Sequence, residues 1–158
     1  MPRAAARVIL AFDFGLRRIG IASGDTVTRR AAPHSAVTVP AGGIDWRPID
    51  RVIEAFQPDL LVVGSPLNAD GTPGSLAAAA GRFAAALAER SRLPVQRTDE
   101  YASSLEAAET LRQQRASGQR RRRVQRADID SAAAAIILER WLRVEAERVD
   151  GDESGGTD

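Results

Sequence analysis

The sequence contains no cysteine, no lysine and only one histidine, His34. Without cysteine the chain forms no disulfide and offers no thiolate to a metal ion, and one histidine is too few for a His-rich zinc site. Any metal must therefore be held mainly by oxygen ligands. Aromatic residues make up only 4% of the chain, so Ala, Val, Ile and Leu must build most of the hydrophobic core.

Apolar runs long enough to cross a membrane are also missing. The first apolar run reaches Asp13 too early to serve as a signal-peptide core, and the Ala-rich segment 76–88 is interrupted by Arg82. We therefore expect a cytoplasmic protein with no membrane contact. The 158 residues, 44% of them apolar, suit a single domain with a real core.

The net charge is only +1, but the charges are unevenly distributed. Residues 150–158 carry four acids and no base, and without these acids the net charge rises to +5. This Gly-rich acidic end favours disorder, so we predict one domain over residues 1–147 and a disordered tail over residues 148–158. All 22 basic residues are Arg, whose guanidinium suits bidentate phosphate contacts. A GC-rich genome would also encode Arg in place of Lys, so this preference has little weight by itself.

The hydrophobic pattern predicts a mixed α/β sheet. Residues 7–13 form a nearly continuous apolar run that ends in an acid, which is typical of a buried strand. Two more short strands, 19–23 and 37–39, suggest an antiparallel start. Strands and helices then alternate, which implies parallel strands joined by right-handed crossovers. The expected segments are helix 46–56, strand 60–63, helix 75–90, strand 94–97, helix 103–115 and helix 128–147.

Three carboxylates are candidates for a shared site. Asp13 ends the first strand, Glu100 follows the strand that ends near Arg97, and Asp130 lies in the first turn of the last helix. Ligands of α/β sheets collect beyond the carboxyl ends of parallel strands, so the three acids can converge there. Such a set of oxygen ligands suits Mg²⁺ or Mn²⁺, and two such ions can cleave a phosphodiester.

Each acid also has a structural interpretation. An Asp at a strand end often forms a turn, and an acid in the first turn of a helix often caps it. Glu100 can equally be a solvated loop acid. Spacing alone therefore leaves the catalytic and the structural interpretations open.

Four blocks of the sequence resemble, in the right order, the hallmark blocks of the YqgF/RuvX family. They are LAFDFGLRRIGIASGD (10–25), VVGSPLNADGTPG (62–74), TDEYASSLEAAETL (98–111) and DIDSAAAAIILERWL (128–142). This family is known as Holliday-junction-resolvase-like and is implicated in maturation of 16S rRNA. The resemblance implies a ribonuclease H-like fold with a mixed five-stranded sheet and flanking helices. It also places the family's catalytic and metal-binding acids on Asp13, Glu100 and Asp130.

Two positions depart from the family pattern. The family usually has Arg after the Glu, where this chain has Tyr101, and basic residues before the last Asp, where this chain has Asp128. Tyr can hydrogen-bond or stack on a base but cannot hold a phosphate as Arg does. Asp128 either joins the metal ligands or caps the helix, and we favour capping. Both changes concern substrate affinity more than cleavage.

Basic residues near the candidate site are expected to bind the nucleic acid backbone. Some are close to Asp13, and others lie in the loop before the last helix, where a solvated loop is the alternative. Asn68 lies in a turn that precedes a helix and can orient substrate. The expected contacts are Arg17, Arg18, Asn68, Arg120, Arg121, Arg122, Arg123 and Arg126.

The function that these features favour is a metal-dependent nuclease acting on structured RNA, in processing of the 5′ end of precursor 16S rRNA. A Holliday junction resolvase would keep the chemistry but require a dimer. A non-catalytic nucleic-acid-binding transcription factor would not need the acids. A sugar-kinase or actin-like ATPase is suggested by Asp13-Phe14-Gly15, but such enzymes bind ATP between two domains. The sequence leaves open whether the chain is a monomer or a homodimer.

Overall fold

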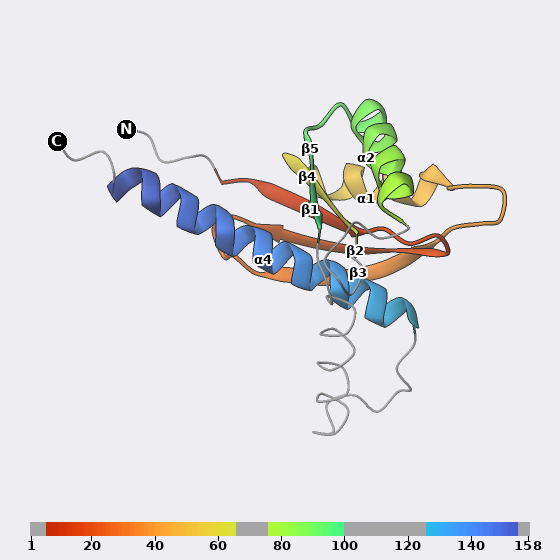
Figure 1. Cartoon of the computed structure of the whole chain (residues 1–158), viewed down its shortest axis with the longest axis horizontal. Coiled ribbons are helices and arrows are strands. Elements are labelled where there is room, and N and C mark those ends of the chain that lie inside the picture. Colours follow the sequence, from red (N-terminus) through yellow and green to blue (C-terminus); the bar gives the residue numbers. More distant parts are fainter. Residues whose placement is uncertain (1–5, 66–75, 100–125, 155–158) are drawn as a thin grey trace, which may run out of the picture.

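The computed structural model describes residues 6–65, 76–99 and 126–154, and its elements are shown in Figure 1. In chain order they are β1 (Val8–Asp13), β2 (Arg18–Asp25), β3 (Ala31–Thr38), α1 (Trp46–Phe56), β4 (Leu60–Ser65), α2 (Ala77–Ser91), β5 (Val95–Asp99) and α4 (Arg126–Ser154). None of the helices within these residues has a stretch that is both long and apolar enough to span a membrane.

The five strands form one mixed sheet in the order β3-β2-β1-β4-β5. β1 pairs antiparallel with β2, and β2 pairs antiparallel with β3. β1 pairs parallel with β4, and β4 pairs parallel with β5. Short turns join the antiparallel strands, whereas α1 and α2 make the crossovers that parallel pairing requires. The predicted mixed sheet is therefore confirmed.

Helices cover both faces of the sheet, with α1 and α2 on one side and α4 on the other (Figure 1). Successive strand residues point to opposite faces, so each strand supplies two cores. On the α1/α2 side, Leu10 and Phe12 pack with helix residues such as Ile49 and Phe83. On the α4 side the cluster contains Ile9, Ala11, Ala22, Leu60, Val62, Ala134, Ala135, Ile137, Leu138 and Leu142.

Local signals explain where α1 begins and how it packs. The side chain of Asp45 accepts a hydrogen bond from the Arg47 backbone N–H at 3.1 Å, which caps the helix. Trp46, the first residue of α1, stacks on Phe83 of α2 with ring centroids 5.5 Å apart. These contacts join the two crossover helices above the sheet.

The bounds of β3 and α4 differ most from those that the sequence pattern predicts. β3 spans Ala31–Thr38 rather than residues 37–39, and Pro33 lies within it. Because β3 is an edge strand, a residue without an N–H is tolerated there. α4 continues to Ser154 rather than ending near Glu147, so the expected start of the tail at residue 148 falls within this helix. The predicted helix 103–115 lies outside the described residues.

Candidate active site

Asp13 ends β1 on the face of the sheet that α4 covers. It follows Ile9 and Ala11 in the strand alternation, and both of those side chains pack in the α4-side core. Asp13 is 8% exposed, and it is the only buried acid among the side chains that the structure describes. Because burying a carboxylate costs free energy unless it is paired, Asp13 is held at this place by specific interactions and not by hydrophobic packing alone.

Glycines occupy the positions beside Asp13 on both neighbouring strands. Asp13 is paired with Gly20 of β2 and with Gly64 of β4. Neither glycine projects a side chain beside the carboxylate. A Cβ on Gly64 would lie 2.6 Å from Cδ1 of Ile137, so the glycine also allows α4 to approach β4 closely. The sequence around Asp13 thus keeps its strand neighbours small.

The carboxyl ends of the three parallel strands meet at this edge. Asp13 is in register with Gly64, and Ser65 is in register with Asp99 at the end of β5. β5 therefore ends directly before Glu100, two residues further than the sequence pattern indicated. Glu100 itself lies outside the described residues, so its place in the predicted set of three acids stays a prediction.

The direction of α4 places its first turns at the same edge. Ile137 meets Gly64, Leu142 meets Gly24 and Glu145 meets Arg7, so α4 runs antiparallel to β1. Asp130 precedes Ile137 by two turns, about 10 Å along the axis, on the side toward the end of β1. By helical spacing, position 130 shares a face with positions 134 and 137, whose side chains are buried. The structure describes the backbone of Asp130 but not its side chain.

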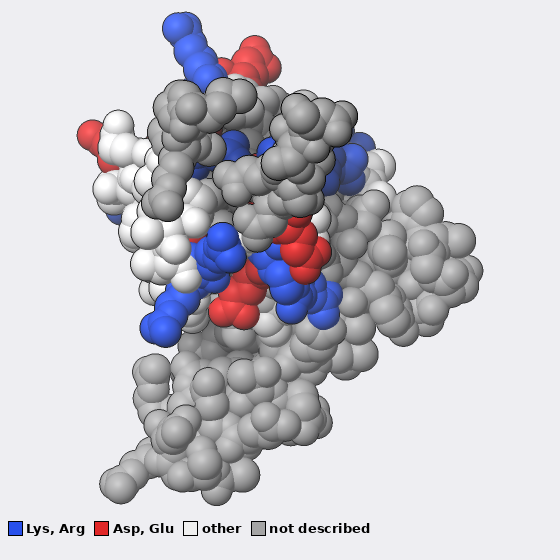
Figure 2. All heavy atoms as spheres, turned by 90° about the vertical axis from the view of Figure 1, so that its left-hand side faces the viewer, with Lys and Arg blue, Asp and Glu red and all other residues white. Residues whose placement is uncertain are grey.

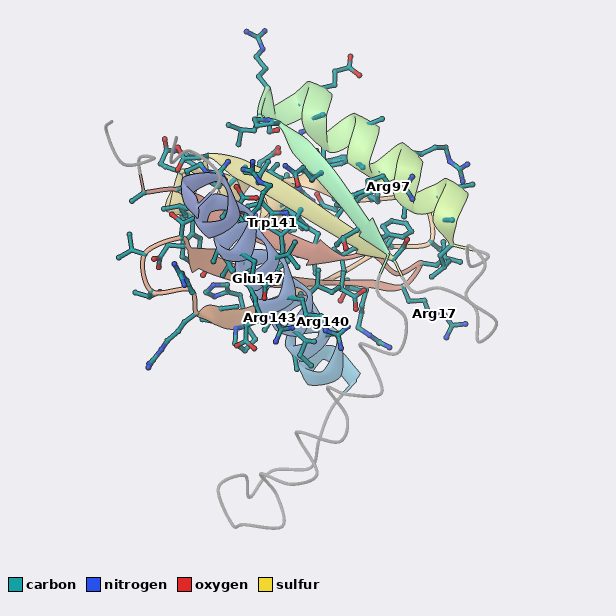
Figure 3. All side chains as sticks on the ribbon, turned by 60° about the vertical axis from the view of Figure 1, so that its left-hand side comes forward. Arg17, Arg97, Arg140, Trp141, Arg143 and Glu147 are labelled. Carbon is teal, nitrogen blue, oxygen red and sulfur yellow. The ribbon has the colours of Figure 1, made fainter. Side chains whose placement is uncertain are left out.

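The turn that follows Asp13 presents Arg17 and leads into Arg18. Arg17 is exposed, and Figure 3 shows it extended away from the sheet. Arg18 is half-buried, opens β2 and is in register with Thr38 of β3. Both basic residues therefore lie at the same end of the sheet as Asp13, as the sequence suggested. Whether they contact phosphate stays a prediction.

The remaining predicted substrate contacts are beyond what the structure describes. Arg126 is the first residue of α4, and only its backbone is described. Outside the described residues lie Asn68, Arg120, Arg121, Arg122 and Arg123. Among the described side chains, no three His, Cys, Asp or Glu residues gather as a metal-binding group. That set excludes Glu100 and the Asp130 side chain, so the predicted metal ligands stay a prediction.

Sequence reasoning missed two buried serines near this edge. Ser65, 3% exposed, is the last residue of β4, and Ser131, also 3% exposed, directly follows Asp130 on α4. The Ser131 Oγ has no hydrogen-bond partner among the described residues. A polar residue at the end of a parallel strand, and another beside a helical Asp, were the available signals.

Shifted pKa values occur at other places in the molecule. Hydrogen bonds from Arg148, opposed by partial burial, lower the pKa of Glu145 near the end of α4, and Arg7 acts in the same direction. A backbone hydrogen bond from Thr28 lowers the pKa of Asp25. Desolvation lowers the pKa of His34, whose Nε2 lies 2.6 Å from the Ser23 Oγ. Asp25 ends β2, His34 lies in β3 and Glu145 lies late in α4, so none of these pKa shifts concerns Asp13.

Comparison with solved structures identifies the fold. RuvC of Thermus thermophilus, solved in complex with a Holliday junction substrate, has a TM-score of 0.51 at 15% identity and covers 89% of this chain and 96% of its own. The yeast mitochondrial Holliday junction resolvase Ydc2 has a TM-score of 0.53 at 15% identity, covering 87% of this chain and 78% of its own. The fold is therefore the ribonuclease H-like fold of these resolvases.

Sequence comparison identifies the family. A protein of Xanthomonas axonopodis pv. citri described as “Putative pre-16S rRNA nuclease” is 44% identical over 146 residues, which span 90% of this chain and 94% of that protein. The family model described as “RuvX: Holliday junction resolvase” matches residues 7–144. Because the family model spans most of the chain and the Xanthomonas protein is 44% identical, this chain belongs to the RuvX family.

Proposed function

We propose that this chain is a metal-dependent nuclease that hydrolyses phosphodiesters in structured RNA and processes the 5′ end of precursor 16S rRNA. The observation that carries the proposal is Asp13, a buried carboxylate at the carboxyl end of β1 with glycine on both neighbouring strands. Family membership supports the chemistry, and the 44% identical Xanthomonas protein supports the RNA substrate.

Asp13, Glu100 and Asp130 would hold the metal in this proposal. The donor set fits Mg²⁺ or Mn²⁺, because all three residues offer carboxylate oxygens and the chain has no thiolate to attract a softer metal. When bound, such ions lower the pKa of a water molecule and stabilise the oxygen that leaves the phosphorus. Asp13 supplies a fixed ligand, because β1 is paired on both sides and its last side chain is enclosed.

Arginines would hold the RNA backbone beside these acids. Arg17 is exposed at the end of the sheet that carries Asp13, so it can reach a phosphate next to the cleaved bond. Arg18 and Asn68 are proposed to orient the same strand. A basic stretch before α4 is proposed to gather the rest of the substrate: Arg120, Arg121, Arg122, Arg123 and Arg126.

Residues 1–147 are proposed as the nuclease domain, acting in the cytoplasm where precursor rRNA is made. A second candidate function keeps the same acids but cleaves four-way DNA junctions. The family description, which names Holliday junction resolvase, favours this candidate. Symmetric cutting of a junction requires two copies of the chain, so a monomer in solution would count against this second function.

The test is a cleavage assay with the full chain. A labelled 16S precursor and a labelled four-way DNA junction are each incubated with Mg²⁺, Mn²⁺ or EDTA. Asp13→Asn should reduce RNA cleavage at least about a hundredfold, because an amide would hold the proposed metal less well and so remove several kcal/mol of transition-state stabilisation. The matched control is Glu147→Gln, an exposed acid later on α4, which should cleave like the parent (Figure 3).

The outcomes separate the candidates. Metal-dependent cleavage of the RNA that is lost in Asp13→Asn supports the proposal. Cleavage of the junction alone transfers the function to DNA recombination. Binding of RNA with no cleavage under any metal, unchanged by Asp13→Asn, would sink the nuclease proposal and leave a non-catalytic binding factor.

A further inference from the structure

Two backbone hydrogen bonds and a tight bend fix the turn between β1 and β2. The Phe14 N–H donates to the Gly64 carbonyl at 3.0 Å, which ties the start of the turn to β4. The Val39 N–H donates to the Arg17 carbonyl at 2.7 Å, which ties its end to the segment after β3. Inside the turn, a Cβ on Gly15 would lie 2.6 Å from the Arg18 carbonyl oxygen, so the chain bends tightly there. The backbone of residues 14–18 is therefore preorganised.

This turn presents an apolar side chain and a cation next to Asp13. Leu16 is 63% exposed, and its neighbour Arg17 is exposed as well. A single exposed apolar side chain is not unusual. Val27, for example, is 70% exposed in the turn between β2 and β3 at the opposite end of the sheet. What distinguishes Leu16 is its position three residues after the buried carboxylate, on a braced turn, beside an Arg that extends away from the sheet (Figure 3).

We propose that Leu16 packs against the face of an unpaired base of the substrate strand while Arg17 contacts a phosphate of the same strand. The inference rests on the proposed nuclease function and adds a property of its substrate. Nucleic acid offers a negative phosphate and an apolar base face within one nucleotide, which matches a cation and an apolar side chain on adjacent residues.

The strand beside Asp13 must then be single-stranded. In a duplex the base faces are covered by their stacked neighbours, so Leu16 would find no apolar surface there. Leu also has no hydrogen-bonding group, so this contact tolerates any base. In this proposal, Leu16 makes the chain prefer single strands to duplexes. Arg17 attracts the phosphates of single strands and of duplexes alike.

The experiment measures binding of a fluorescein-labelled single-stranded RNA and of the same strand annealed to its complement, in EDTA so that no cleavage occurs. Leu16→Ser should weaken binding of the single strand about threefold to tenfold and leave binding of the duplex unchanged. Its dependence on salt should match the parent, because an apolar contact releases no counterions. Arg17→Ala should weaken both and reduce the salt slope by about one.

Val27→Ser is the matched control, since it removes an equally exposed apolar side chain from the other turn. It should bind both RNAs like the parent. Equal binding of the single strand by Leu16→Ser and the parent would overturn the inference while leaving the nuclease proposal intact. An equal loss on single strand and duplex would also overturn it, because no base face would be involved. Failure of the parent to bind either RNA would overturn the inference, whereas the nuclease proposal is decided by the cleavage assay.

Discussion

The two ends of the sheet use charge in different ways. Where β1, β4 and β5 end, a buried Asp13 has glycines as its strand neighbours, and Arg17 is exposed on the adjacent turn. At the opposite end, Arg7 pairs with Glu145 at 2.9 Å, and Glu145 also pairs with Arg148 at 2.6 Å. Figure 2 faces this second end and shows basic and acidic side chains next to one another.

We infer from this contrast that the proposed catalytic site and the charged contacts that hold α4 in place lie at different ends of the sheet. The charges at the second end are matched by other protein groups, and the Arg7 guanidinium also lies 5.7 Å from the centre of the Trp141 ring. These contacts hold α4 against the start of β1. At the first end, the buried Asp13 lies at the carboxyl ends of the parallel strands, where the proposed metal site would be. Substitutions at the two ends should therefore affect different measurements.

The largest effect on stability is expected where α4 meets the sheet at the first end. In Gly64→Ala the new Cβ would lie 2.6 Å from Cδ1 of Ile137 and 3.3 Å from its Cγ2, so the Ile137 side chain or the helix that carries it must shift. We expect a loss of about 1–3 kcal/mol in the free energy of unfolding, measured by urea denaturation, together with reduced RNA cleavage.

A double-mutant cycle tests the cause of that loss. Ile137→Val removes Cδ1, so its combination with Gly64→Ala should lose less stability than the sum of the two single variants. Gly42→Ala is the control, because a Cβ there meets nothing within 4 Å. If Gly64→Ala is as stable as the parent and cleaves RNA normally, close packing of α4 on Gly64 is not required for the proposed site.

A smaller effect is expected from Arg7→Ala at the second end. This variant loses the ion pair with Glu145 and the contact with Trp141, which together contribute about 1 kcal/mol. Thermal unfolding should detect the loss, while RNA cleavage by the folded protein should stay unchanged. Arg143→Ala, an exposed residue of the same helix, should leave both measurements unchanged (Figure 3). Reduced cleavage by folded Arg7→Ala would contradict the inference that the second end contributes to stability and not to catalysis.

The smallest effect is a dependence of stability on pH. Hydrogen bonding from Arg148 is the main influence that lowers the pKa of Glu145 below its ordinary value in the folded chain. The carboxylate therefore stabilises the fold above its ordinary pKa, and this contribution disappears as the pH falls through the lowered pKa. Relative to the parent, Glu145→Gln should be less stable at neutral pH, and the difference should vanish in acid. A constant difference across a urea-denaturation series at several pH values would contradict this assignment.

The beginning of the sheet could be predicted because its signals are local. The apolar run 7–13 is nearly continuous, and a strand covered on both faces requires such a run, so the position of Asp13 at its end followed directly. The alternation of strands and helices after residue 45 indicated the parallel half of the sheet for the same kind of reason. Both patterns depend only on the order of apolar and polar residues along the chain.

The extent of β3 and of α4 could not be predicted in this way. β3 is an edge strand whose residues are largely exposed, so it lacks the apolar pattern of a buried strand and tolerates Pro33. α4 passes through an acidic segment that reads as disorder by composition, yet it is helical to Ser154. Composition reports average tendencies, whereas the extent of β3 is set by its pairing with β2.

The sequence by itself determined which chemical groups the site can use: carboxylate oxygens and arginines, but no thiols. The fold determined how these groups are arranged. Strand pairing set Gly20 and Gly64 beside Asp13, and the packing of Ile137 on Gly64 directed the first turns of α4 toward the end of β1. The pairing of Asp13 with Gly64 and the packing of Ile137 on Gly64 join residues more than fifty positions apart, and only the folded chain brings such residues into contact.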